Sequence, residues 1–199
     1  MTNKRQLKKK ADIIYRDYVN FDGMRLPIQN SPLYGSYLNI LSRTNSLCKA
    51  MLSHHCKIYA LRVDLHINHL VWQEGHLSKF FKNATRQLKE KYSCNKIGYL
   101  WVREANQDGH SHFHYHIVFF INGHRVNRSK GITDILLKVW KKLGHSSIWT
   151  CEGHLLTSIS NSEFQDAFHH FSYLAKIRSK DFQPPHKQNF NYSRVQIAY

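Results

Sequence analysis

Three features are scarce in this sequence of 199 residues: long hydrophobic runs, cysteine and acidic side chains. The longest unbroken apolar run, residues 117–121, is far shorter than the roughly 20 residues that cross a bilayer. The basic residues 4–10 are followed by a mixed segment instead of the apolar core of a signal peptide. The sequence therefore predicts a cytoplasmic protein that neither spans a membrane nor is secreted.

Only four cysteines are present, and they are too far apart for the paired knuckles of a zinc site. A core of the size expected for this length needs no disulfide framework, so we expect reduced thiols. A glycine-rich loop followed by Lys-Ser or Lys-Thr is also absent, which excludes the common nucleotide-binding motif of helicases.

Acidic residues are few: 13 Asp and Glu stand against 29 Lys and Arg, which gives a formal net charge of +16. A surface of this charge attracts phosphate chains, because neutralised phosphates release condensed counterions. The positive charge is spread over residues 4–194 and not collected on one amphipathic basic helix, which disfavours a membrane surface as the partner. Nucleic acid is therefore the first expected partner.

The alternation of helical and strand patterns predicts an α+β protein. Helices are expected from Ser31-Pro32 to about residue 52, and over 77–92, 132–143 and 161–178. Strands are expected over 57–67, 98–104, 112–121, 147–151 and, at an edge, 194–198. Asp108-Gly109 is a turn signal that joins two of these strands in a hairpin. We expect one domain over residues 31–199, with an antiparallel sheet of about five strands and flanking helices, after a basic, mobile arm over residues 1–30.

The strongest chemical signal is a strand that carries His112, His114 and His116. Side chains alternate along a strand, so the three histidines share one face, with neighbours about 7 Å apart, and two of them can hold one cation. Glu104 ends the preceding strand, and a hairpin can bring it alongside the histidines. Two imidazoles and a carboxylate leave coordination positions open, as a catalytic metal site requires.

A second signal is Tyr173 with Lys176 near the end of the last expected helix. At about 100° per residue, Tyr173 lies opposite the apolar face of that helix and close to Lys176. A phenol with an ordinary pKa of about 10 becomes a nucleophile when cations stabilise the phenolate. The helix must then lie at the edge of the sheet, or Tyr173 must be brought to the histidines by movement.

These motifs resemble a known family. His114-Tyr115-His116 resembles the His-hydrophobic-His motif of the HUH endonucleases, and residues 173–176 resemble their Tyr-x-x-Lys nucleophile helix. More closely, residues 61–66, 99–104, the His-Tyr-His strand and residues 172–176 resemble the YagK/YfjJ C-terminal domain family, which includes a replication protein of inoviruses. The resemblance covers about residues 55–185.

The resemblance implies a ferredoxin-like HUH endonuclease fold, in a phage or prophage protein that initiates rolling-circle replication. Such an enzyme nicks and joins single-stranded DNA at an origin, and a host helicase and polymerase of the bacterial cell complete the replication. His114 and His116 would hold Mg²⁺ or Mn²⁺, with Glu104 as the third ligand, although Asp64 or His66 on the adjoining strand can replace it. His112 adds a third histidine, so the choice of pair follows from the family spacing.

The resemblance also implies roles for the remaining residues. Tyr173 would attack the scissile phosphate and form a 5′-phosphotyrosine, and Lys176 would stabilise charge on the phosphate or the phenolate. Arg62 and Arg103 are the expected DNA-binding residues. Two other function classes stay open. One is a basic single-stranded nucleic-acid-binding or regulatory protein without catalysis, and the other is a metallohydrolase in which water attacks.

Overall fold

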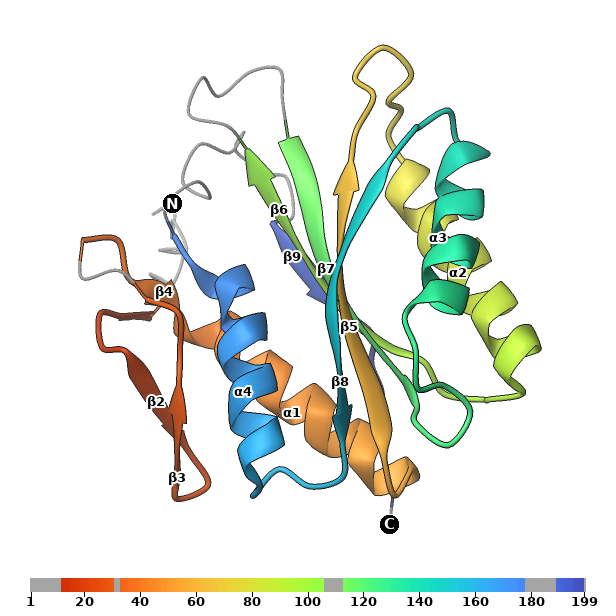
Figure 1. Ribbon diagram of the computed structural model, residues 1–199. Helices are drawn as coiled ribbons and strands as arrows, with labels where there is room; N and C mark the ends of the chain where they lie inside the picture. The colour runs from red at the N-terminus through yellow and green to blue at the C-terminus, as the bar shows by residue number, and fades with distance from the viewer. Residues whose placement is uncertain (1–11, 31–32, 106–112, 178–188, 199) are drawn as a thin grey trace, which may run out of the picture.

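A five-stranded antiparallel sheet runs through the centre of the protein (Figure 1). The computed structural model describes residues 12–30, 33–105, 113–177 and 189–198. In spatial order the strands are β8 (Ile148–Leu156), β5 (Ile58–His66), β7 (Phe113–Asn122), β6 (Gly98–Ala105) and β9 (Phe190–Tyr192). β7 is the middle strand, and its residues 117–121 are all buried because both faces of the sheet are covered. The predicted α+β class with a five-stranded antiparallel sheet is confirmed.

Helices cover both faces of the sheet. On one face lie α1 (Leu38–His54) and α4 (Ser162–Phe171), and on the other lie α2 (His76–Tyr92) and α3 (Lys130–Lys141) (Figure 1). Alternate residues of β7 enter the two cores: Val118 and Phe120 pack with α1 and α4, whereas Ile117 and Phe119 pack with α2 and α3. The sheet alternation therefore determines which side chains share a face. No helix among the described residues is long and apolar enough to span a membrane.

The chain before α1 folds onto the domain, which differs from the mobile arm expected up to residue 30. β2 (Tyr18–Phe21) and β3 (Met24–Pro27) form a hairpin, and β1 (Ile13–Ile14) pairs with β4 (Ser36–Tyr37). Asp22 and Gly23, with φ of 53° and 78°, supply the positive dihedral angles of a tight two-residue hairpin turn. Val19, Leu26 and Ile28 are buried in the same core as α1 and α4, and the apolar contacts outweigh the polar appearance of the segment. Residues 1–11 lie outside the described part.

Three further boundaries differ from the sequence expectation. The strand expected to end at residue 151 continues to Leu156 as β8. The first helix starts at Leu38 and not at Ser31, because Gly35 turns the chain with φ of 72° and Ser36–Tyr37 pair with β1. The edge strand is formed by residues 190–192 and not by 194–198, because residues 190–192 pair with β6. The turn signal Asp108-Gly109 lies outside the described residues, although the β6–β7 hairpin that it predicts is present.

The last helix is also shorter than expected. α4 ends at Phe171, and a 3₁₀ turn, η1 (Ser172–Ala175), replaces the remaining helical residues. Side chains rotate by about 120° per residue in a 3₁₀ turn and by about 100° in an α-helix, so the helical projection does not apply to Tyr173.

Candidate metal centre and nucleophile

The sheet register gathers the acidic and histidine side chains on the face that α1 and α4 cover. His114 of β7 pairs with His66 of β5 on one side and with Glu104 of β6 on the other. Two residues further along β7, His116 pairs with Asp64. Directly paired residues point to the same face of a sheet, and these pairs are in phase with Val118 and Phe120 of the α1–α4 core.

Glu104, His114 and His116 converge on one point. Their ligand atoms, two imidazole nitrogens and a carboxylate oxygen, all lie within 4.8 Å of one another. The two Nε2 atoms are 3.0 Å apart, and Nε2 of His114 is 3.6 Å from Oε2 of Glu104. Oε2 of Glu104 also contacts Nε2 of His116 directly. These three residues are the only such group among the described residues, and we refer to them as the candidate metal centre.

Asp64 lies behind this centre and orients one of its ligands. Its Oδ1 is 2.7 Å from Nδ1 of His116. Nη2 of Arg62 is also 3.2 Å from Nδ1, but a guanidinium can only donate, so the shorter contact places the imidazole proton between Nδ1 and Asp64. His116 is only 3% exposed, and its Nε2 faces Glu104 and His114. A carboxylate in this position fixes the tautomer and raises the basicity of a ligand histidine.

Arg62 holds Asp64 in the ionised state. Its Nε and Nη2 donate to the two oxygens of Asp64 over 3.2 Å and 3.0 Å. Burial by itself would raise the pKa of Asp64, but the hydrogen bonds and charges of His116 and Arg62 outweigh burial and lower it. Arg62, Asp64 and His66 alternate along β5 with core residues of the opposite face, so they share one face of the sheet, and Arg62 supports the centre there.

Tyr173 lies directly against the candidate metal centre. Its ring meets the imidazole of His116 edge to face, with the centroids 5.1 Å apart. The guanidinium of Arg62 lies 4.1 Å from the ring centroid, and Nζ of Lys176 lies 5.3 Å from it. Burial is the main cause that raises the pKa of the Tyr173 phenol, Glu104 adds to the effect, and Arg62 opposes it. The helical projection had left the direction of Tyr173 open, and the 3₁₀ turn places it at the centre without movement of a helix.

The segment before α1 holds this turn in place. The amide of Gln29 donates to Oγ of Ser172 over 2.7 Å, and Ser172 donates in turn to the carbonyl of His169. The amide of Ile177 donates to the carbonyl of Gly35, and Ser36 forms a β-bridge with Lys176. No local pattern predicts this support, because the interacting residues are 140 or more positions apart.

The remaining residues named from the sequence lie elsewhere. His66 is exposed and its ring stacks on His114 at 6.2 Å, but it is not part of the three-residue cluster. Arg103 is on the opposite face of the sheet, 8% exposed, with its guanidinium 3.9 Å from the centroid of Phe113. Arg103 is therefore separated by the sheet from the candidate metal centre, and its expected contact with DNA stays a prediction. His112 lies outside the described residues.

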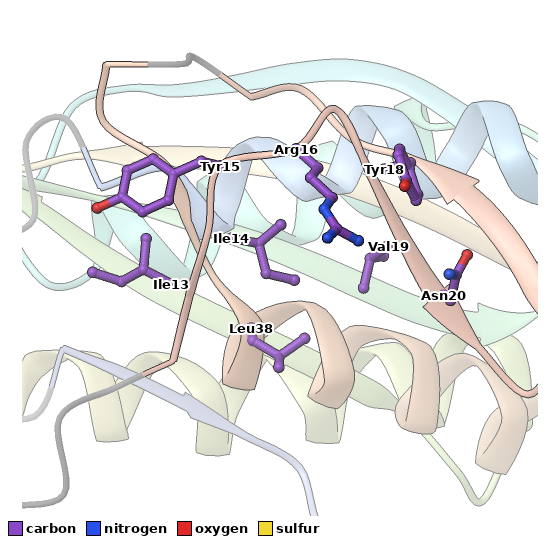
Figure 2. Close-up of a pocket in the computed structure, with 8 residues that line it drawn as sticks. All are labelled: Ile13, Ile14, Tyr15, Arg16, Tyr18, Val19, Asn20 and Leu38. Atoms are coloured by element: carbon purple, nitrogen blue, oxygen red, sulfur yellow. The ribbon is translucent and has the colours of Figure 1, made fainter.

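An open pocket of about 480 Å³ lies apart from the candidate metal centre (Figure 2). It is lined by β1, β2 and the start of α1, with the apolar side chains Ile14, Val19 and Leu38 beside Arg16 and Tyr18. Its lining includes none of Glu104, His114, His116 or Tyr173. The chemistry-bearing groups are thus on the sheet face and not in this cavity.

Fold and site together define a class: an α+β domain whose antiparallel sheet carries a Glu-His-His group beside a tyrosine. The family model of the YagK/YfjJ C-terminal domain matches residues 19–193. The chain belongs to the YagK/YfjJ C-terminal domain family. No curated protein and no solved structure matches it. The matched range includes the β2–β3 hairpin, which the sequence analysis had left outside the domain.

Proposed function

We propose that this protein is a metal-dependent nuclease that nicks and joins single-stranded DNA at a specific site and thereby initiates rolling-circle replication. The observation that carries the proposal is the contact between Tyr173 and His116, which puts one nucleophile beside one group of metal ligands. The net charge of +16 supports a polyanionic substrate. Membership of the HUH endonucleases is part of the proposal.

The donor set fits a divalent cation. Glu104, His114 and His116 supply one oxygen and two nitrogens from one side, which leaves positions for water and phosphate oxygens. The contact with Asp64 keeps Nε2 of His116 available for a metal. Bound Mg²⁺ or Mn²⁺ would supply Lewis-acid stabilisation of charge on the scissile phosphate.

The chemical step assigned to Tyr173 is a transesterification. Its Oη forms a bond to the phosphorus while the bond between phosphorus and the 3′ oxygen breaks. The phenolic proton leaves to solvent, and the released 3′ oxygen takes up a proton to become a 3′-OH primer end. The product is a 5′-phosphotyrosine, and reversal by a second 3′-OH joins two DNA ends.

Two cations next to the Tyr173 ring support this step. Arg62 lies 4.1 Å from the ring centroid and opposes the rise of the phenol pKa, so it favours the phenolate. Nζ of Lys176 lies 5.3 Å from the same ring centroid, so Lys176 can pair with the phenolate or the phosphate. Neither residue is placed as a metal ligand.

Unwinding and DNA synthesis are assigned to other proteins. The sequence holds no nucleotide-binding loop of the helicase type, so a host helicase and polymerase are the proposed partners. This implies action in the cytoplasm of a bacterial host cell.

The test is incubation with labelled single-stranded DNA of candidate origin sequence and Mn²⁺, followed by a denaturing gel. A labelled adduct that migrates with the protein supports the proposal, and peptide mass spectrometry must locate it on Tyr173. Cleavage without an adduct would show that water attacks, and a shift in a native gel without cleavage would show a binding module. Either of these two outcomes would overturn the covalent mechanism.

A further inference from the structure

An exposed tryptophan lies beside the candidate metal centre on the same face of the sheet. Trp149 of β8 pairs directly with Asp64 of β5, and Asp64 pairs with His116 of β7. The three side chains form one row across neighbouring strands. Because strands are about 4.8 Å apart, the Trp149 backbone is about 10 Å from that of His116.

The surface around Trp149 is open. α4 covers the other end of β8, where His154 contacts Phe171 and Leu156 is fully buried. At the near end Trp149 is 66% exposed, although its strand neighbour Ile148 packs into the core of α2 and α3. His66, whose ring stacks on His114, is also exposed on this face. Two aromatic planes therefore face solvent next to the candidate metal centre.

We infer that Trp149 is a stacking platform for a nucleobase of single-stranded DNA, and that it sets the distance between that base and Tyr173. This inference rests on the proposed function and adds a substrate contact that the metal ligands do not provide. An exposed indole offers a flat aromatic face, and every base can stack on such a face. The high positive charge of the chain selects a polyanion as that partner.

The spacing suits a nucleotide chain. About 10 Å corresponds to roughly three stacked nucleotides at 3.4 Å each, and to fewer where the strand is extended. A base held at Trp149 would thus be within a few nucleotides of the scissile phosphate. Stacking is tolerant of sequence, so Trp149 contributes affinity and register more than base identity.

Trp149 offers a direct optical test. Of the other tryptophans, Trp140 is fully buried, Trp101 is 8% exposed and Trp72 is partly buried, so quenching by added iodide reports mainly on Trp149. Titration with single-stranded oligothymidine in EDTA should quench the emission and protect it from iodide. Trp149→Ala should remove that signal and weaken oligothymidine binding by about 5- to 150-fold, whereas Trp149→Phe should retain part of the affinity.

Leu155→Ala is the matched control. Leu155 is exposed on the same strand, but its partner Tyr59 belongs to the core of the opposite face. Its truncation should leave the affinity for oligothymidine unchanged. Equal affinity of Trp149→Ala and the unmodified protein would overturn the inference, and so would tighter binding of duplex than of single-stranded DNA.

Failure of this inference is distinguishable from failure of the nuclease. Adduct formation by the unmodified protein together with unchanged affinity of Trp149→Ala would overturn only the stacking role. Stacking at Trp149 without any adduct would support the platform and overturn the covalent mechanism. If sedimentation shows self-association that Trp149→Ala abolishes, with no change in DNA affinity, the surface is a contact between copies and the inference is wrong.

Discussion

Asp64 and His116 form the contact on which the candidate metal centre depends: Oδ1 of Asp64 lies 2.7 Å from Nδ1 of His116. The two residues are 52 positions apart in the chain and become neighbours through the register of β5 and β7. Asp64 is thus a positioning residue that acts through His116. The sequence had offered it as an alternative third ligand, and in the structure Glu104, not Asp64, lies in one cluster with the two histidines.

Asp64→Asn should lower the affinity for Mn²⁺ by about 10- to 100-fold, because the neutral amide removes the charge that supports the ligand histidine. Isothermal titration calorimetry with Mn²⁺ measures the change. His66→Asn is the matched control, since His66 is on the same strand and face but outside the cluster. If His66→Asn weakens binding more than Asp64→Asn does, the geometry of the centre is different from the one described.

His114→Ala and His116→Ala should each abolish metal-dependent cleavage while DNA binding persists. The ligands serve the chemistry, whereas attraction of phosphates depends on the distributed positive charge. His112→Ala should retain at least part of the activity. A filter-binding assay run beside the cleavage gel separates the two effects. An inactive His112→Ala together with an active His116→Ala would mean that a different histidine pair holds the metal.

Tyr173→Phe should bind DNA and metal but form no covalent adduct. The substitution removes only the phenolic oxygen and leaves the ring contacts with His116 and Arg62 in place. Lys176→Ala should slow the same step without removing it. Tyr115→Phe is the control, because Tyr115 belongs to the core on the opposite face. Undiminished adduct in Tyr173→Phe, measured by gel and mass spectrometry, would refute the assignment.

Leu26→Ala should reduce the free energy of unfolding by about 2–5 kcal/mol, as expected for a leucine truncated in a packed core. Leu26 is fully buried and belongs to the β2–β3 hairpin. Leu33→Ala, in an exposed turn of the same region, should change stability little. Urea unfolding followed by circular dichroism measures both. Equal, small effects would show that the hairpin is not part of the core.

Acid should destabilise the fold through His145, which is buried, and His170, which is half-buried. Burial, with the neighbouring His76 and His69, lowers the pKa of His145 to about 4, and burial, with His154 and Arg62, lowers that of His170 to about 4. Between about pH 6.5 and 4 the unfolded chain binds more protons than the folded chain, so stability is lost as the pH falls through this range. Urea unfolding at pH 7.5, 6 and 5 should show falling midpoints. A constant midpoint would contradict the burial of both imidazoles.

Local periodicity was sufficient to predict the histidine-bearing strand and the two helices on the opposite face of the sheet. Alternation along residues 112–121 predicted a strand with histidines on one face, and helical periodicity predicted α2 and α3 within two residues of their bounds. These signals are strong because side-chain direction repeats every 2 or 3.6 residues, which any short window of sequence displays. The excess of Lys and Arg over Asp and Glu is likewise a property of the sequence and does not depend on the fold.

Tertiary structure alone decided which carboxylate joins the two histidines, which carboxylate supports His116, and where the proposed nucleophile Tyr173 lies. From the sequence, Asp64 or His66 could replace Glu104 beside the two histidines, and only the register of β6, β7 and β5 distinguishes them. Tyr173 faces the centre because α4 gives way to a 3₁₀ turn, and Gln29, Gly35 and Ser36 hold that turn through backbone contacts. Contacts between residues far apart in the chain form only when the whole domain folds, so no local periodicity in the sequence predicts them.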